Sequence, residues 1–373
     1  MVGRRELIRR GFGLVAVVTI GDVIAACGPA AVSAPSIAPT AAATLPPTPS
    51  PLPPPETTII RLSPGACDAP LILAEKFLKE EGFTDIQYST VGGVPSLTDN
   101  KADLAAMFAP TLATAVDGGA AVISIGGLHP GCAEIWAPAG VATLKDLKGH
   151  TVIVRSKAPS DLAYSYMAIG LKNAGVDPSE VNFVVQADAD LTKLFLEGKS
   201  DLLFLATTAA FGFKSNTANK GKVVLDQAMA EPWAGKNCCV LTTTTAWLKA
   251  NPIAAKRTLR AIYRAADSAP KDRAEAAKIA TDKGLFGGAA NVELARGAAN
   301  MVSYDWRKYD VTESMKFHAD LLGAVGLLKG KPEDAVTKSL DLRFAKELAK
   351  ELKTSRRPPP AAAHREANIA LGT

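Results

Sequence analysis

The chain alternates short apolar runs with helical segments along most of its length. The strand-like runs, rich in β-branched and aliphatic side chains, are residues 58–62, 86–90, 103–108, 120–125, 151–154, 181–185, 201–205 and 238–245. Helical patterns occupy residues 68–82, 109–118, 161–173, 190–197 and 252–266. Such alternation is typical of parallel sheets whose two faces are covered by helices. The sequence therefore predicts an α/β fold.

Length and charge narrow the class of protein further. The 373 residues are 47% hydrophobic, which at about 150 residues per domain is enough for two compact lobes. The 42 basic residues barely exceed the 37 acidic ones, and a net charge of +5 is too weak and too mixed for a nucleic-acid-binding protein. No run of 18 or more apolar residues is present, which excludes a bundle of membrane-spanning helices.

The first 27 residues have the pattern of an export signal. Four arginines, at positions 4, 5, 9 and 10, precede an apolar stretch at 14–20 and small residues that end at Cys27. Residues 24–27 resemble a bacterial lipobox, in which cleavage before the cysteine is followed by its lipidation. The general secretion route and the twin-arginine route both remain open. The alternative is a short helix that ends in an ordinary buried thiol. We expect a lipid anchor on Cys27 that holds the protein at the outer face of the cytoplasmic membrane or in the periplasm.

Both ends of the folded body are expected to be disordered. Ten of the thirty residues at 28–57 are proline, and most of the others are Ala, Ser or Thr. Such a segment cannot build a core and favours extended conformations, so it is interpreted as a tether. The tail at 354–373 contains three consecutive prolines at 358–360 and is likewise expected to lack structure.

Seven segments, in this order, resemble substrate-binding proteins of ABC importers. The family is the nitrate, sulfonate and taurine branch, NMT1/THI5-like and SsuA-like. The segments are CDAPLILAEKFLKEEGF (67–83), GGLHPGCAEIW (126–136), LKDLKGHTVIV (144–154), LFLEGKSDLLF (194–204), EPWAGKNCCVL (231–241), NPIAAKRTLRAIYRAAD (251–267) and YDWRKYD (304–310).

The resemblance implies a two-lobed, type II-like periplasmic binding protein fold, each lobe a mostly parallel sheet flanked by helices. Lobe 1 would comprise residues 58–142 plus 236–353, lobe 2 residues 143–235, and the hinge segments would lie near 137–143 and 233–239. A monomer of this kind would close on a small solute and deliver it to an ABC permease in the membrane. The resemblance implies no catalysis and no cofactor.

A ligand site is expected where loops follow the carboxyl ends of the strands and lead into helix N-termini. Several such N-termini around one crevice favour an anionic solute. The expected ligand-binding residues are Ser63, Cys67, Asp68, Phe108, Pro110, Thr111, His129, Ser156, Ser160, Thr207, Thr208 and Trp233.

Some of these residues have a structural alternative. His129 precedes Pro130 and could be a turn histidine, and Trp233 could pack at the hinge without touching ligand. Ser160, just before Asp161, could serve as a helix cap. The four threonines at 242–245 are explained by β-propensity.

Four cysteines remain once Cys27 is assigned to lipid, an even number that suits an oxidising compartment. Cys132 could bridge to Cys238 or to Cys239, whereas a bond between these two adjacent residues would be strained. Metal binding is the competing interpretation for the cysteines. Because no CxxC or histidine-rich spacing accompanies them, we expect no metal site.

The expected function is capture of a sulfonate, nitrate or thiamine-pyrimidine precursor outside the cytoplasm. One alternative is a THI5-like pyrimidine-synthesis enzyme, whose relatives use pyridoxal phosphate and a cysteine-rich motif that NCCV at 237–240 matches only superficially. The sequence also lacks a GxSxG elbow, a phosphate loop and a paired His-Glu metal motif. A sensory binding protein without a transporter is a further alternative.

Overall fold

The computed structural model describes residues 53–216, 221–285 and 302–352. The predicted export signal, most of the tether and the tail at 354–373 therefore lie outside the described residues. Among the described residues, no helix is both long enough and apolar enough to cross a membrane.

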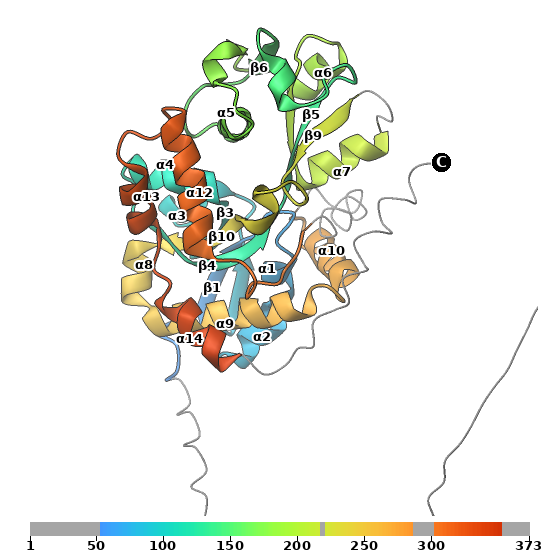
Figure 1. Ribbon diagram of the computed structural model, residues 1–373. Coiled ribbons are helices and arrows are strands. Elements are labelled where there is room, and N and C mark those ends of the chain that lie inside the picture. Colours follow the sequence, from blue (N-terminus) through green and yellow to red (C-terminus); the bar gives the residue numbers. More distant parts are fainter. Residues whose placement is uncertain (1–52, 217–220, 286–301, 353–373) are drawn as a thin grey trace, which may run out of the picture. The chain divides into compact units, whose positions relative to one another are not determined.

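A five-stranded sheet, sheet A, has the order β2-β1-β3-β10-β4 (Figure 1). Its strands are β1 (Ile59–Ser63), β2 (Asp85–Tyr88), β3 (Leu104–Phe108), β4 (Val122–Pro130) and β10 (Asn237–Thr244). β1 pairs in parallel with β2 and β3, whereas β10 pairs antiparallel with both β3 and β4. Because β10 is inserted between two earlier strands, the chain must leave sheet A after β4 and return to it.

Helices from both ends of the body cover sheet A. They are α1 (Ala69–Leu73), α2 (Glu75–Glu80), α3 (Gly93–Thr98), α4 (Ala109–Asp117), α8 (Thr245–Ala250), α9 (Pro252–Ser268), α10 (Arg273–Asp282), α12 (Val311–Ala324), α13 (Pro332–Ser339) and α14 (Arg343–Glu351). The predicted apolar stripe of α9 is confirmed, since Ala255, Leu259 and Ile262 are fully buried. Its burial supplies much of the free energy that holds α9 on α1 and α2.

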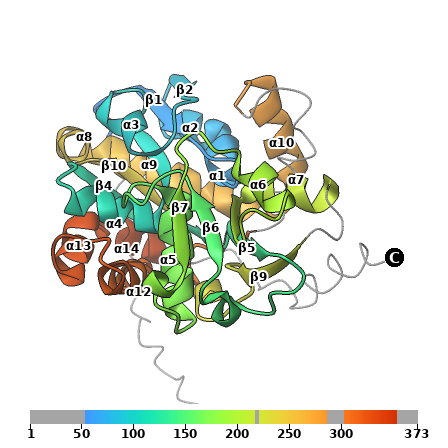
Figure 2. The same ribbon diagram turned by 90° about the horizontal axis from the view of Figure 1, so that it is seen from above.

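The middle of the chain forms two smaller sheets (Figure 1). Sheet B, in the order β8-β5-β9, contains β5 (Ala133–Ala137), β8 (Leu203–Ala206) and β9 (Lys222–Asp226), and sheet C pairs β6 (Thr151–Val154) with β7 (Asn182–Val185). The helices here are η1 (Leu144–Leu147), α5 (Leu162–Asn173), η2 (Pro178–Glu180), α6 (Leu191–Leu196), α7 (Thr207–Asn216) and η3 (Trp233–Gly235). Seen from above, α5 lies next to α12, with which it is in contact (Figure 2).

The passage from β4 to β5 depends on one glycine. Gly131 has φ +59°, a conformation that side-chain-bearing residues rarely adopt, and a Cβ added to it would lie 2.6 Å from the Cα atom of Ala228. Ala228 lies between β9 and β10, on the segment that returns the chain to sheet A. The two crossing segments therefore touch at a point where only glycine fits.

The α/β class with helix-flanked sheets is confirmed, but three details differ from the sequence-based expectation. The pairing is mixed rather than mostly parallel, because β10 runs back through sheet A and β5 is antiparallel to β8 and β9. The first crossing lies at residues 131–132, not 137–143, because the apolar run of β5 pairs within sheet B. The return lies between β9 and β10, so residues 237–239 already belong to sheet A.

The expected helix over 68–82 is interrupted. It consists of α1 and α2, separated at Ala74, and the side chain of Asp68 makes no capping hydrogen bond to α1. The Asp68 carboxylate instead accepts a hydrogen bond from the Gly65 amide, 2.6 Å away, and its other oxygen has a partner in sheet A. Tertiary contacts thus replace the local cap.

Candidate functional site

The loop between β1 and α1 folds back on itself at the edge where β1 ends. Ser63 is buried and its hydroxyl donates to the Val91 carbonyl at 2.7 Å. The bond from the Gly65 amide to Asp68 Oδ2 then closes the loop and aims Asp68 Oδ1 at sheet A. Two of the predicted residues, Cys67 and Asp68, are consequently held inside the protein, 4% and 1% exposed.

His129 on β4 meets this loop. Its Nε2 lies 2.9 Å from Asp68 Oδ1, and its Nδ1 lies 3.3 Å from the Pro130 carbonyl oxygen. Burial on its own disfavours the charged imidazolium, but interactions with Cys67 and with the Asp68 carboxylate outweigh burial and raise the pKa of His129 to about 10. The pair is therefore a buried ion pair that links the β1–α1 loop to sheet A.

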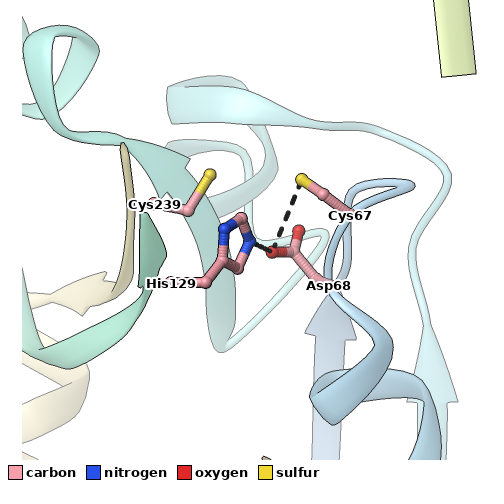
Figure 3. Close-up of side chains that lie close together, drawn as sticks. All are labelled: Cys67, Asp68, His129 and Cys239. Atoms are coloured by element: carbon pink, nitrogen blue, oxygen red, sulfur yellow. Dashed lines mark hydrogen bonds and ion pairs between the residues drawn. The ribbon is translucent and has the colours of Figure 1, made fainter. Parts of the chain in front are cut away.

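Cys239 completes a group of four side chains. In the register of β10 against β4, Cys239 lies opposite His129. One ligand atom from each of Cys67, Asp68, His129 and Cys239 lies within 4.8 Å of every other. Figure 3 shows these side chains, which come from the β1–α1 loop, β4 and β10, close together. We call these residues the four-residue cluster. A hydrogen bond with Cys239, together with burial, raises the pKa of the Cys67 thiol well above its usual value.

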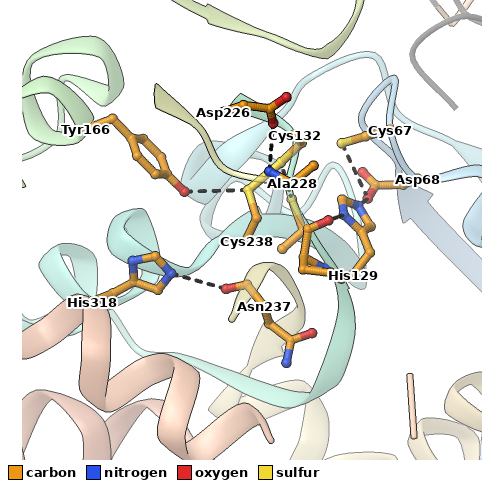
Figure 4. The surroundings of a disulfide bond; sticks show 12 residues. Cys67, Asp68, His129, Cys132, Tyr166, Asp226, Ala228, Asn237, Cys238 and His318 are labelled. Atoms are coloured by element: carbon orange, nitrogen blue, oxygen red, sulfur yellow. Dashed lines mark hydrogen bonds and ion pairs between the residues drawn. A yellow bond between two sulfur atoms is a disulfide. The ribbon is translucent and has the colours of Figure 1, made fainter. Parts of the chain in front are cut away.

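A disulfide lies next to the cluster. Cys132 and Cys238 are joined in the structure, so of the two partners considered for Cys132 it is Cys238 that takes the bond. The bond connects the first crossing segment to β10 of sheet A, and the Tyr166 hydroxyl lies 3.5 Å from Cys238 Sγ (Figure 4). The thiol of Cys239 remains free at 3.6 Å from Cys132 Sγ.

Aromatic side chains join the two parts of the body, the first built on sheet A and the second on sheets B and C. The ring of Tyr166 on α5 meets Phe108 at the end of β3 edge-on, at 5.8 Å, and stacks on Phe204 of β8 at 5.2 Å. Tyr166 is fully buried, so burial raises its pKa well above the usual value. The carboxyl end of β3 is therefore covered by a helix of the second part.

A second aromatic group surrounds a histidine of α12. Trp233 of η3 is 2% exposed and packs edge-on against Phe317 at 4.9 Å, with His318 at 5.8 Å. Burial and the nearby Lys236 lower the pKa of His318 to about 4, although its Nε2 is 3.2 Å from the Asn237 carbonyl oxygen. Trp233 thus packs against α12, and its contact with a ligand stays a prediction.

The helix N-termini differ in how well they could receive an anion. At α5 the carboxylate of Asp161 already accepts a hydrogen bond from the Tyr164 amide at 2.8 Å. At α1 the N-cap residue is Asp68, whose negative charge would repel an anion. At α4 no side chain among the described residues caps the first turn, and Thr111 there is half-buried. The first turn of α4 is accordingly the better candidate for an anion.

The structure brings some of the predicted residues together and separates others. Ser63, Cys67, Asp68 and His129 meet at the β1–α1 loop, and Phe108, Pro110 and Thr111 follow at the next strand end. Ser156 is half-buried, with its hydroxyl accepting the Ala158 amide at 2.9 Å, and Ser160 is exposed on the same loop. Thr207 and Thr208 begin α7.

Two cavities lie away from all twelve predicted residues. One, of about 590 Å³, is lined by Ile123, Thr245, Leu248, Lys249, Pro252, Asp341, Arg343 and Phe344. The other, of about 600 Å³, is lined by Gly149, Lys157, Tyr164, residues 177–183, Ala324 and Val325. The second is bordered by sheet C and by the end of α12, so it touches both parts of the body.

Sequence reasoning missed several residues that build this region. Cys239 was considered as a disulfide partner or, with the other cysteines, as a metal ligand, but not as a neighbour of His129. Tyr166 lies in a helix without a polar signal, and His318 was not singled out. Tyr304, whose hydroxyl donates to the Cys67 carbonyl at 2.6 Å, belongs to the segment YDWRKYD that carries the family resemblance. That segment was the one available signal for Tyr304.

The chain matches a known protein family. Residues 76–276, more than half of the chain, match the family model described as NMT1/THI5 like. No curated protein sequence matches the chain.

Solved structures give the same result at the level of the fold. The periplasmic nitrate-binding protein NrtA from Synechocystis PCC 6803 is 16% identical, with TM-score 0.63, over 81% of this chain and 90% of that one. The periplasmic aliphatic sulphonate binding protein SsuA from Escherichia coli is 14% identical, with TM-score 0.60, over 82% and 98%. The alkanesulfonate-binding protein SsuA from Xanthomonas axonopodis pv. citri is 18% identical, with TM-score 0.57, over 75% and 98%. The chain is a member of the NMT1/THI5-like family and has the two-lobed fold of periplasmic binding proteins.

Proposed function

We propose that the protein is the solute-binding component of an ABC importer, which captures a small anionic or heteroatom-rich solute and delivers it to a permease. The observation that carries the proposal is the insertion of β10 between β3 and β4, within a chain of this family. Two crossings between lobes allow the lobes to rotate about short segments, which is the movement that a hinge-closing carrier requires.

The contact between the crossing segments supports hinge closure. Gly131 and Ala228 touch, and the disulfide of Cys132 with Cys238 ties the first crossing segment to the start of β10, where the second crossing ends. These links hold the axis in place while the lobes move. A solute that contacts both lobes would favour the closed form by the difference in its affinity for the two forms.

The first turn of α4 is our proposed contact for the negative group of the solute. Its amides and the hydroxyl of Thr111 are donors at the end of β3, next to the place where Phe108 meets Tyr166 of the second part. A sulfonate or nitrate suits such donors, and a thiamine-pyrimidine precursor is the third solute class we propose.

The test of solute binding is titration calorimetry with taurine, ethanesulfonate, nitrate and hydroxymethylpyrimidine. We expect one of them to bind, and Thr111→Ala to weaken that binding by roughly tenfold or more through the lost hydrogen bond to a charged group. Thr98→Ala, an exposed threonine of α3, is the matched control and should bind as the unchanged protein does. Small-angle scattering should show a smaller radius of gyration with the solute bound. Failure of all four solutes to bind, or chemical conversion of any of them, would contradict the proposal and in the second case favour a THI5-like enzyme.

We also propose that lipid on Cys27 anchors the protein in the cell envelope, on the outer face of the cytoplasmic membrane or in the periplasm. Cys27 lies outside the described residues, and the proposal rests on the lipobox-like residues 24–27. In cells grown with labelled palmitate, the unchanged protein should become labelled and Cys27→Ser should not. In detergent phase partitioning, the unchanged protein should enter the detergent phase and Cys27→Ser the aqueous phase. Equal labelling of both proteins would overturn the anchor without affecting the proposed solute binding.

A further inference from the structure

We propose that the four-residue cluster is a structural binding site for a divalent metal ion of the zinc type. The site would be separate from the proposed solute contact at α4. Its ligands would be the sulfur atoms of Cys67 and Cys239, Nε2 of His129 and a carboxylate oxygen of Asp68. Neither the family match nor the proposed solute binding requires it.

The spacing of the four atoms is close to that of a tetrahedral zinc site. Zinc binds sulfur, nitrogen and oxygen at about 2.0–2.3 Å, which places neighbouring ligands roughly 3.3–3.8 Å apart. The cluster atoms all lie within 4.8 Å of one another. A movement of about 1 Å or less would complete the tetrahedron, with the more distant atoms moving inward and His129 Nε2 separating slightly from Asp68 Oδ1, which lies 2.9 Å away.

The chemistry of the donors selects the metal class. Two thiols and an imidazole are soft or borderline ligands, which favour zinc over magnesium or calcium, because those ions prefer sites made of oxygen atoms. With four protein ligands, the site would have no open position for a substrate. The four side chains are 4%, 1%, 0% and 2% exposed, in the order Cys67, Asp68, His129 and Cys239. A buried, fully coordinated ion has a structural role rather than a catalytic one.

Neighbouring groups orient each ligand from outside the cluster. With its proton on Nδ1, His129 donates to the Pro130 carbonyl and directs the lone pair of Nε2 inward. The Gly65 amide holds Asp68 Oδ2, which leaves Oδ1 for the metal. The Tyr304 hydroxyl holds the carbonyl of Cys67. Such outer hydrogen bonds are a regular feature of metal sites, where they fix the direction of the ligands.

The metal would also protect the neighbouring disulfide from the free thiol of Cys239. Cys239 Sγ lies 3.6 Å from Cys132 Sγ of the disulfide. A free Cys239 thiolate could attack Cys132, forming a bond between these two sulfurs and releasing the thiolate of Cys238, a step that consumes no oxidant. Coordination of Cys239 would keep its sulfur from that exchange, so the metal would preserve the bond between Cys132 and Cys238.

The experiment uses the full chain, purified without chelator and then loaded with zinc. Zinc content after gel filtration should be one ion per chain. Replacement by Co²⁺ should give the visible ligand-field bands of a tetrahedral ion and a charge-transfer band from thiolate. Peptide mapping after alkylation should find Cys67 and Cys239 as thiols once the metal has been removed.

The variants are chosen so that loss of a ligand can be separated from loss of the fold. Cys67→Ser and Cys239→Ser should each weaken zinc binding by more than about 100-fold, beyond the 10–100-fold typical of outer-shell changes. Asp68→Asn retains the shape of the side chain and serves as a milder ligand change, with circular dichroism as the check of folding. His150→Gln is the matched control, since His150 also pairs with a carboxylate, that of Asp201, but lies outside the cluster. It should leave zinc binding unchanged.

Three results would overturn the proposal. The first is a disulfide between Cys67 and Cys239 in the purified protein, because those sulfurs could not then bind metal. The second is folded protein with both thiols intact that retains no zinc and gives no cobalt spectrum. The third is equal zinc binding by Cys67→Ser, Cys239→Ser and the unchanged protein. Because none of these results depends on a solute, failure of the metal site and failure of the proposed solute binding are distinguishable.

Discussion

Two histidine–aspartate pairs lie in different parts of the body and have nearly the same geometry. His129 Nε2 is 2.9 Å from Asp68 in sheet A, and His150 Nδ1 is 3.1 Å from Asp201 beside sheet C. In the first pair the side chains are 0% and 2% exposed, whereas in the second they are 39% and 29% exposed. Distance alone would therefore rate the two pairs as equal.

Because the two pairs differ in exposure, they should differ in how much each contributes to the free energy of unfolding. Water screens the exposed pair, so its contribution to stability is small. In the buried pair each charged group depends on the other, because removal of one partner leaves the other without water or a counter-charge. His318 is the third case, because it is buried among aromatic rings, pairs with no carboxylate of the described residues and stays neutral.

The largest effect is expected from removing the carboxylate of the buried pair. Asp68→Ala should lower the free energy of unfolding by about 3 kcal/mol, at the low end for a broken buried pair because His129 can release its proton. The measurement is urea denaturation at neutral pH with a chelator present, so that metal plays no part. The matched variant Asp201→Ala should lose less than about 1 kcal/mol. Equal losses in the two variants would show that exposure does not separate the pairs.

The next effect concerns the pH dependence that His318 imposes. Its pKa is about 4 in the folded protein and about 6.5 when unfolded, so the unfolded chain binds the proton more readily. Stability should therefore fall as the pH decreases from about 6.5 towards 4, by about 3 kcal/mol in total.

The comparison protein is His318→Phe, which retains an aromatic ring on α12 and cannot take up a proton. The difference in unfolding free energy between the unchanged protein and this variant should change with pH over the window from 6.5 to 4. The carboxylates shared by both proteins cancel from that difference. A difference that does not vary with pH would mean that His318 is not the titrating group.

A smaller effect is expected from the hydroxyl that supports the four-residue cluster. Tyr304→Phe removes the donor to the Cys67 carbonyl and leaves that buried acceptor unpaired, at a cost of about 1–2 kcal/mol. Tyr309→Phe, a half-buried tyrosine nearby, should change the unfolding free energy by less than about 0.5 kcal/mol. Thermal or urea unfolding would distinguish the two, and a loss as small in Tyr304→Phe as in Tyr309→Phe would be evidence against this role of the hydroxyl.

Local patterns predicted much of the fold. The β-branched run at 151–154 forms β6 with the predicted bounds, and the alternating apolar face of α9 is buried as expected. The helices expected from Asp161 and Asp190 form as α5 and α6, although the residue that caps α5 is Asp161 itself and not the Ser160 considered for that role. In these cases the residues that determine the structure lie next to each other in the chain.

Long-range pairing limited the rest of the prediction. The fourth strand was expected over the apolar run at 120–125, but pairing with β10 extends β4 to Pro130. The same pairing places Cys239 opposite His129, and the loop of Cys67 and Asp68 reaches both from another strand. No spacing within the sequence indicates that meeting. For this reason the individual residues of the β1–α1 loop were predicted, and the cluster that they form was not.

The smallest expected effect tests the exposed half of the comparison. His150→Gln removes the imidazole from Asp201, but Asp201 Oδ2 still accepts a hydrogen bond from the Thr151 amide, so no carboxylate is left unsatisfied. The unfolding free energy should change by no more than about 0.5 kcal/mol, as for other exposed ion pairs. Urea denaturation at low and high salt measures it, because screening should reduce even this difference. A loss near the 3 kcal/mol expected for Asp68→Ala would mean that the exposed pair, despite its contact with water, stabilises the second lobe as strongly as the buried pair stabilises the first.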